Sequence, residues 1–150
     1  VEATVQVNDA RKRAMGRKVI KAMGGEARGK TVGVLGLTFK PDTDDMRDAP
    51  SLALIQALQD AGATVKAYDP EGVEQARPLL NNVEFAASPY AAAEGADALV
   101  IVTEWAAFRA LDLARIAKSM SDPVLVDLRN IYPPEEAARA GLKLTGIGKG

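Results

Sequence analysis

The segment that decides the fold is residues 97–105, which read DALVIVTEW. Its central part, 98–103, is almost continuously apolar, a pattern typical of a strand that is covered on both faces. Segments 31–37 (TVGVLGL) and 124–128 (VLVDL) have a similar composition. Helices on both faces of a parallel sheet bury strands of this kind, so we expect an α/β fold.

Weaker strands and helical segments alternate with these three strands. Six strands joined by helices predict a Rossmann-like, doubly wound and mainly parallel six-stranded sheet. In such sheets ligands bind at the carboxyl ends of the strands, so functional residues should follow strands directly. The remaining strands are expected at 63–70, 82–86 and 142–148, and the helices at 51–62, 71–80, 88–96, 111–120 and 133–141.

A longer helix is expected before the sheet, over residues 3–24, and Gly24-Gly25 should end it. A single helix has nothing of its own to pack on. We therefore expect this helix to be the end of a preceding domain or an element of a dimer.

Composition restricts the chemistry that the chain can perform. The 150 residues are 47% hydrophobic and 26% charged, which is ordinary for one soluble domain, and they include no cysteine and no histidine. Disulfides, thiolate nucleophiles, imidazole bases and the usual zinc sites are thereby excluded. No apolar run has the length of a membrane span and the start does not resemble a secretory signal, so we expect a cytoplasmic location and no membrane partner.

Basic residues gather near the amino terminus. Residues 1–30 hold eight Lys or Arg and three Asp or Glu. A nucleic-acid or membrane partner would usually add aromatic residues, and the basic segment has none, so a solvated helix face is the better interpretation. The cluster consists of Arg11, Lys12, Arg13, Arg17, Lys18 and Lys21.

The loop after the first strand, residues 36–48, reads GLTFKPDTDDMRD. A dinucleotide site would show GxGxxG here, whereas Gly33 and Gly36 are spaced GxxG, so this sequence does not support an NAD fingerprint. Lys40 and Arg47 instead supply two cations near the start of the next helix, which suits a phosphate or pyrophosphate. A loop held together by Asp–Arg pairs explains the same composition equally well.

Arg129 follows the fifth strand and should lie at the same sheet edge as Lys40. A guanidinium there can grip a phosphate with two hydrogen bonds. A salt bridge to Asp127 or Asp44 is the alternative. The ligand interpretation is favoured because cations recur at one edge.

Three further positions after strands have less specific patterns. Trp105 and Phe108 could stack on a ligand, but packing against the sheet and the following helix is the more frequent role. Glu104 could bind a sugar or a backbone amide. Asp69 precedes Pro70, which favours a turn over a ribose contact.

Three motifs occur together and in order: GLTFKPDTDDMRDAPS at 36–51, ADALVIVTEWAAF at 96–108 and VDLRNIY at 126–132. Together they closely resemble the carboxy-terminal, UDP-binding domain of the UDP-glucose/GDP-mannose dehydrogenase family. The TEW and DLRN segments look most like its UDP-glucose branch. Residues 7–25 resemble the end of the family's central helical region, which forms the dimer core. The resemblance therefore implies that residues 1–24 end this dimerising region and that residues 25–150 form the carboxy-terminal, UDP-sugar-binding domain.

The resemblance implies a function for the whole protein. This family oxidises the C6 alcohol of a nucleotide sugar to a carboxylate in two NAD-dependent steps, using a catalytic cysteine and an amino-terminal NAD-binding domain. Both would precede Val1, so we expect no catalytic residue and no metal site here, and no activity from the chain alone. Expected partners are UDP-glucose, NAD and a second copy of the chain, as a homodimer or higher homo-oligomer.

The resemblance also implies site residues. Phe39, Lys40 and Arg129 would contact the UDP-sugar, with Lys40 and Arg129 near the pyrophosphate. Arg47 would reach across the cleft to NAD. The alternatives are a GDP-mannose or UDP-N-acetylmannosamine dehydrogenase domain, a nucleotide-binding module without chemistry, and a purely structural dimerisation domain.

Overall fold

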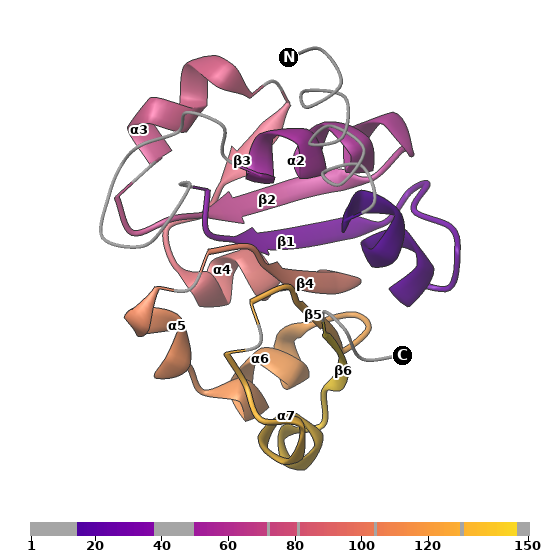
Figure 1. Ribbon diagram of the computed structural model, residues 1–150, viewed down its shortest axis with the longest axis vertical. Coiled ribbons are helices and arrows are strands. Elements are labelled where there is room, and N and C mark those ends of the chain that lie inside the picture. Colours follow the sequence, from indigo (N-terminus) through magenta and orange to yellow (C-terminus); the bar gives the residue numbers. More distant parts are fainter. Residues whose placement is uncertain are drawn as a thin grey trace, which may run out of the picture.

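The protein forms one six-stranded sheet with helices on both faces (Figure 1). The computed structural model describes residues 15–37, 50–71, 73–80, 82–103, 105–129 and 131–146. The strand order is β3-β2-β1-β4-β5-β6 and every neighbouring pair is parallel, so the predicted doubly wound sheet is confirmed. The strands are β1 (Thr31–Leu35), β2 (Thr64–Tyr68), β3 (Val83–Phe85), β4 (Ala98–Ile101), β5 (Val124–Asp127) and β6 (Lys143–Gly146).

The helices fall where the sequence predicts them, with two differences. The helix expected at 71–80 changes to a 3-10 turn at Arg77, because Pro78 cannot continue the α-helical hydrogen bonds. One short helix, α5, was not expected. The helices are α2 (Pro50–Asp60), α3 (Val73–Ala76) with the 3-10 turn η1 (Arg77–Leu79), α4 (Pro89–Ala93), α5 (Ala106–Arg109), α6 (Leu113–Ser119) and α7 (Pro134–Ala140).

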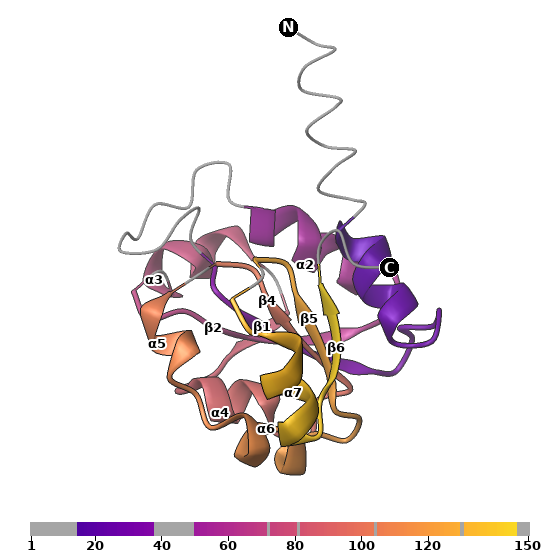
Figure 2. The same cartoon turned by 60° about the horizontal axis from the view of Figure 1, so that its bottom comes forward.

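The sheet separates two apolar layers. Figure 2 shows the helices that cover them, above and below the strands. All four residues of β4 are buried, as its apolar sequence predicts. Val100 faces the layer under α2 and the helical residues 15–22, whereas Leu99 and Ile101 face the layer under α4, α6 and α7. Successive side chains of β4 point to opposite faces of the sheet, so this one strand contributes to both apolar layers.

Residues 15–22 are helical and pack on the sheet domain itself. Val19 is fully buried, and a Cβ added to Gly16 would lie 2.7 Å from the Cβ of Ala57 in α2. The expectation that this helix has nothing to pack on is therefore wrong for its described part. The assignment of 1–24 to a dimerising region stays a prediction, because residues 1–14 lie outside the described residues.

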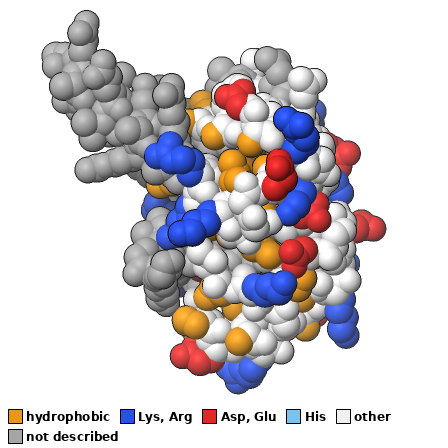
Figure 3. Space-filling view, turned by 90° about the vertical axis from the view of Figure 1, so that its right-hand side faces the viewer, with side chains coloured by type: hydrophobic (Ala, Val, Ile, Leu, Met, Phe, Trp, Pro, Cys, Tyr) orange, Lys and Arg blue, Asp and Glu red, His pale blue; other side chains and the backbone are white. Residues whose placement is uncertain are grey.

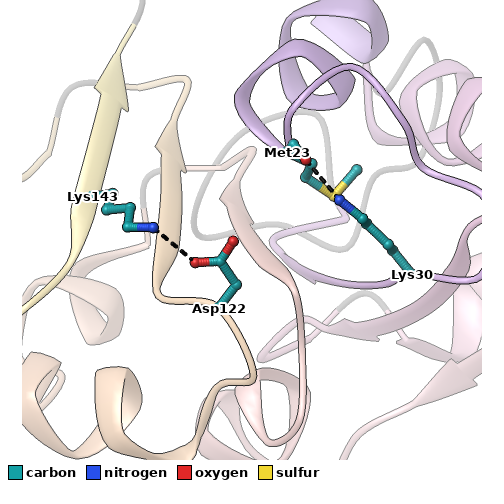
Figure 4. A network of polar contacts seen from close by, with 4 residues as sticks. All are labelled: Met23, Lys30, Asp122 and Lys143. Carbon is teal, nitrogen blue, oxygen red and sulfur yellow. Dashed lines mark hydrogen bonds and ion pairs between the residues drawn. The ribbon is translucent and has the colours of Figure 1, made fainter.

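The end of this helix is well defined. Gly24 and Gly25 have φ of 96° and 91°, and the Gly25 N–H donates to the carbonyl of Ile20 at 3.0 Å. Lys30 Nζ donates to the Met23 carbonyl at 2.7 Å (Figure 4). Positive φ at glycine and a cation on the last carbonyls are the usual ways to end a helix, so the predicted stop is confirmed.

Candidate functional site

The carboxyl edge of the sheet has its switch point between β1 and β4. From β1 the chain continues through α2 to β2 on one side, and α4 returns it to β4 on the other. Gly36, directly after β1, has φ of 96°, and a Cβ there would lie 2.6 Å from the backbone nitrogen of Thr103. The ends of β1 and β4 are therefore in close contact. The loops that follow them diverge from this point, which is where doubly wound folds bind ligands.

Both glycines of the GxxG pattern serve contacts within the chain. A Cβ on Gly33 would lie 2.5 Å from the Ala92 carbonyl oxygen in α4, and Gly36 is closed off by Thr103. A dinucleotide pyrophosphate needs open backbone at such glycines. The described residues after β1 therefore do not fit the pyrophosphate of NAD.

Asp69 fixes the direction in which the chain leaves β1. Its carboxylate is buried, Oδ2 accepts the Leu37 N–H at 2.7 Å and Oδ1 accepts the Glu71 N–H at 2.9 Å. The second contact is the Asp-turn that the Asp69-Pro70 sequence predicts. The turn interpretation of Asp69 is confirmed, and the side chain also reaches across to the neighbouring strand end.

Ser51 holds the start of α2 against the same strand end. Its side chain is buried and Oγ donates to the Leu37 carbonyl at 2.6 Å. Leu37 and Ser51 flank the segment that contains three of the predicted site residues. Phe39, Lys40 and Arg47 lie outside the described residues, but both flanks of their segment are bound to each other at the carboxyl edge.

Arg129 projects from the loop after β5, at the edge where it was predicted, and its side chain is exposed. The adjacent carboxylate of Asp127 is buried. Its Oδ1 accepts the Arg129 N–H at 3.1 Å and its Oδ2 accepts the Tyr132 N–H at 2.9 Å. Both oxygens of Asp127 thus accept hydrogen bonds from backbone N–H groups. Asp44, the other proposed partner, lies outside the described residues.

Tyr132 braces the loop after β5 against the one after β4. Its hydroxyl donates to the carbonyl of Phe108, whose ring meets that of Tyr68 edge-on with 6.3 Å between centroids. Burial raises the pKa of Tyr132 above its usual range, and the Asp127 carboxylate adds to this shift. Sequence reasoning missed the roles of Asp127 and Tyr132, although an Asp two residues before a loop Arg is a recognisable turn signal.

Trp105 and Phe108 are buried together in the layer under α4, α6 and α7. Their packing interpretation is confirmed. Within the described ranges, one buried polar side-chain atom has no hydrogen-bond partner, namely the indole nitrogen of Trp105. Glu104 is outside those ranges.

Two surface grooves lie away from Arg129. One, of about 450 Å³, runs between α4 and α6 beside Tyr90, whose ring carries the Arg115 guanidinium at 4.1 Å from its centroid. The other, of about 480 Å³, lies near Thr64 and Asn82 at the amino edge. Neither has the strand-end position that the sequence predicts for the ligand.

Three features of the described residues bear on other classes of partner. Among the described residues, no group of three or more acidic, His or Cys side chains is arranged to hold a metal ion. None of the helices in those ranges is long and apolar enough to cross a membrane. Figure 3 shows basic and acidic side chains interspersed on one face, where a nucleic-acid site would need a field of one sign. Arg11, Lys12 and Arg13 of the basic cluster are not described.

Comparison of the sequence with known proteins gives consistent matches. Residues 33–134 match the model of the UDP-glucose/GDP-mannose dehydrogenase family, UDP binding domain. The chain is 61% identical over 149 residues to a UDP-glucose 6-dehydrogenase of Rhizobium meliloti, covering 99% of this chain and 34% of that protein. It is 48% identical over 136 residues to a UDP-glucose 6-dehydrogenase of Pseudomonas aeruginosa, covering 83% and 29%. The chain spans about a third of the length of these relatives.

Comparison of the structure gives the same class of protein. A UDP-glucose dehydrogenase from Pyrobaculum islandicum superposes with a TM-score of 0.74 at 31% identity, over 93% of this chain and 30% of that one. An NDP-N-acetyl-D-galactosaminuronic acid dehydrogenase from Methanosarcina mazei gives 0.77 at 27% identity, over 94% and 29%. The similarity covers nearly all of this chain and under a third of each solved one.

Proposed function

This chain belongs to the UDP-glucose/GDP-mannose dehydrogenase family, as its UDP-binding domain, and from that premise we propose that it is the UDP-sugar-binding part of an NAD-dependent UDP-glucose 6-dehydrogenase. The whole protein would oxidise UDP-glucose to UDP-glucuronate in two steps. The observation that carries the proposal is the 61% identity to the Rhizobium meliloti relative over 99% of this chain.

The proposed ligand position is the carboxyl edge, with the diphosphate between Lys40 and Arg129 and Phe39 against the nucleotide sugar. Three observations support this position. It lies at the switch point of a doubly wound sheet, Arg129 is exposed there, and Leu37 and Ser51 hold both ends of the Lys40 segment at the same edge. A cation on each side of a diphosphate would offset its charge with charge-assisted hydrogen bonds.

The redox chemistry is assigned to other parts of the protein. Bound NAD would supply the hydride acceptor. The crowded Gly33 and Gly36 of this chain do not offer its pyrophosphate a cradle. The chain has no cysteine to act as the nucleophile. We therefore assign NAD binding mainly to another domain, with Arg47 as this chain's contact to it, and no catalytic residue to this chain.

The proposal includes assembly as a homodimer or higher homo-oligomer and a cytoplasmic location. The assembly rests on the family resemblance, and the location rests on the apolar runs of this sequence, none of which has the length of a membrane span. Sedimentation of the full-length protein and cell fractionation test them separately.

The substrate is tested with the full-length protein and NAD, by following NADH with UDP-glucose, GDP-mannose and UDP-N-acetylmannosamine. We expect the highest kcat/KM with UDP-glucose, two NADH for each UDP-glucuronate, and no NADH from the isolated chain. Preference for another sugar would assign the chain to a different branch of the family. UDP binding without turnover of any sugar would instead identify a nucleotide-binding module.

Arg47 gives a test of the cofactor contact. In the full-length protein, Arg47→Ala is expected to raise the KM for NAD more than the KM for UDP-glucose, because its guanidinium would serve the cofactor. Equal losses for both substrates would show that Arg47 serves the folding of its own loop, by pairing with Asp44 or Asp48.

A further inference from the structure

We propose that Asp127 is a positioning residue for the nucleotide site, whose buried carboxylate sets the backbone from which Arg129 projects. The inference rests on the proposed function, because Asp127 can position Arg129 for the ligand only if Arg129 binds the diphosphate. It concerns a residue that would not itself touch the ligand.

The loop after β5 is held at successive points. The Leu128 N–H donates to the Ile101 carbonyl at 3.1 Å, so the sheet hydrogen bonding continues one residue past the strand. Asp127 then accepts the N–H groups of Arg129 and Tyr132. The Tyr132 hydroxyl binds the Phe108 carbonyl at the far end of the turn. Arg129 therefore extends from a backbone that is fixed on both sides.

The chemistry of Asp127 suits this role more than a packing role. Asp127 is the last residue of β5, and it is buried like the three apolar residues before it, Val124, Leu125 and Val126. An apolar residue would satisfy the core at no desolvation cost, whereas a buried carboxylate is stabilised only by its hydrogen bonds. Both of its partners are N–H donors, and a carboxylate accepts at both oxygens. An Asn in its place would direct an NH₂ donor at one of them.

The distribution of buried polar side chains supports the same interpretation. In the described part of the chain there are four: Ser51, Asp69, Thr103 and Asp127. All four lie at the carboxyl edge, where β1, β2, β4 and β5 end or α2 begins. Asp69 accepts the N–H two residues ahead of it, as Asp127 does, and it also binds the exit of the neighbouring strand β1 through the Leu37 N–H. Buried polar groups are costly, so their restriction to one edge indicates that loop geometry matters there.

The test is a double-mutant cycle in the full-length protein, with UDP and uridine as ligands. Asp127→Asn is expected to weaken UDP binding about two- to tenfold, the range of one lost hydrogen bond, and to leave uridine binding within about twofold. Arg129→Ala should weaken UDP more. Because Asp127 acts through Arg129, the double variant should bind UDP no more weakly than Arg129→Ala alone.

Asp97→Asn is the matched control. Asp97 Oδ2 accepts the Thr31 N–H at 2.9 Å at the amino edge, so this variant also weakens a carboxylate-to-backbone bond, but far from Arg129. We expect it to lower stability and to leave UDP affinity unchanged. If it weakens UDP as much as Asp127→Asn does, the effect is one of general stability and the positioning role is wrong.

The remaining outcomes separate the two claims. Additive losses in the double variant, equal losses of UDP and uridine, or unchanged UDP affinity in folded Asp127→Asn would each overturn the positioning role alone. Unchanged UDP affinity in Arg129→Ala would overturn the proposed diphosphate contact itself, and the positioning role with it. If Asp127→Asn does not fold, Tyr132→Phe loosens the far end of the same turn. It should weaken UDP without weakening uridine, and unchanged UDP affinity there would contradict the inference.

Discussion

The two edges of the sheet use polar side chains in opposite ways. At the amino edge, Lys143 pairs with Asp122 at 3.2 Å while their side chains are 71% and 42% exposed (Figure 4). Lys30 and Asp97 there bind backbone groups and are only partly buried. At the carboxyl edge, Asp69 and Asp127 are at most 3% exposed and accept two N–H groups each. The polar contacts at the amino edge are therefore solvated and contribute little free energy. Those at the carboxyl edge require the burial of charged side chains, which is costly, and they fix the loops that leave the strands.

Glycine substitutions give the largest expected contrast between the edges. Gly36→Ala should destabilise the domain by about 2–5 kcal/mol, from roughly 1–2 for the left-handed conformation and about 1–3 for the clash with Thr103. Gly29 at the amino edge also has positive φ, but a Cβ there would meet nothing within 4 Å, so Gly29→Ala should cost only about 1–2 kcal/mol. Urea unfolding monitored by the single tryptophan measures both. Equal costs would contradict the close contact between the β1 and β4 ends.

Tyr132→Phe should have an intermediate effect, with a distinct pH dependence. Loss of its hydrogen bond leaves the buried Phe108 carbonyl with the longer bond from the Leu111 N–H at 3.4 Å, which costs about 0.5–1.5 kcal/mol at neutral pH. Because the folded-state pKa of Tyr132 is raised, its contribution to stability is complete below the ordinary tyrosine pKa of about 10 and is lost as pH rises above it. The stability gap between parent and variant should therefore narrow above about pH 10. A gap that widens there would show that the phenol is not buried as described.

Lys143→Ala should have the smallest effect. Its ion pair with Asp122 is exposed, so its loss should cost no more than about 1 kcal/mol and should leave UDP affinity unchanged. The difference from parent should shrink in high salt, because exposed charges are screened. A larger loss of stability that persists in high salt would mean that polar contacts at the amino edge stabilise the fold as strongly as those at the carboxyl edge.

Much of the fold could be predicted because its signals are local. A strand buried on both faces has an apolar sequence wherever it lies, so β1, β4 and β5 were predictable together with the sheet type. The single-turn helix α5 was not, because four residues do not complete a helical pattern. The split between α3 and η1 had a signal in Pro78, but the surrounding apolar spacing suggested one continuous helix.

The site was predictable in position and less so in its supporting contacts. Arg129 could be placed at the carboxyl edge because parallel strands all end there. The role of Asp127 was predictable only in part. An Asp at this position signals a turn, but the acid near an arginine also suggests a salt bridge, and the sequence does not show that the carboxylate accepts the Tyr132 N–H as well. The brace from Tyr132 to Phe108 joins residues 24 positions apart, which only the folded chain brings together.

The most direct test of the account is a calorimetric titration of UDP and uridine into the full-length protein, its Arg129→Ala variant and its Arg129→Lys variant. A charge-assisted hydrogen bond is worth roughly 1.5–3 kcal/mol, so Arg129→Ala should weaken UDP about tenfold to a hundredfold. Arg129→Lys should recover part of this, since lysine cannot form the paired contact of a guanidinium. Uridine, which has no diphosphate, should bind all three proteins alike. If UDP affinity is unchanged, or if uridine loses as much as UDP, Arg129 does not bind the diphosphate and the proposed site at the carboxyl edge is wrong.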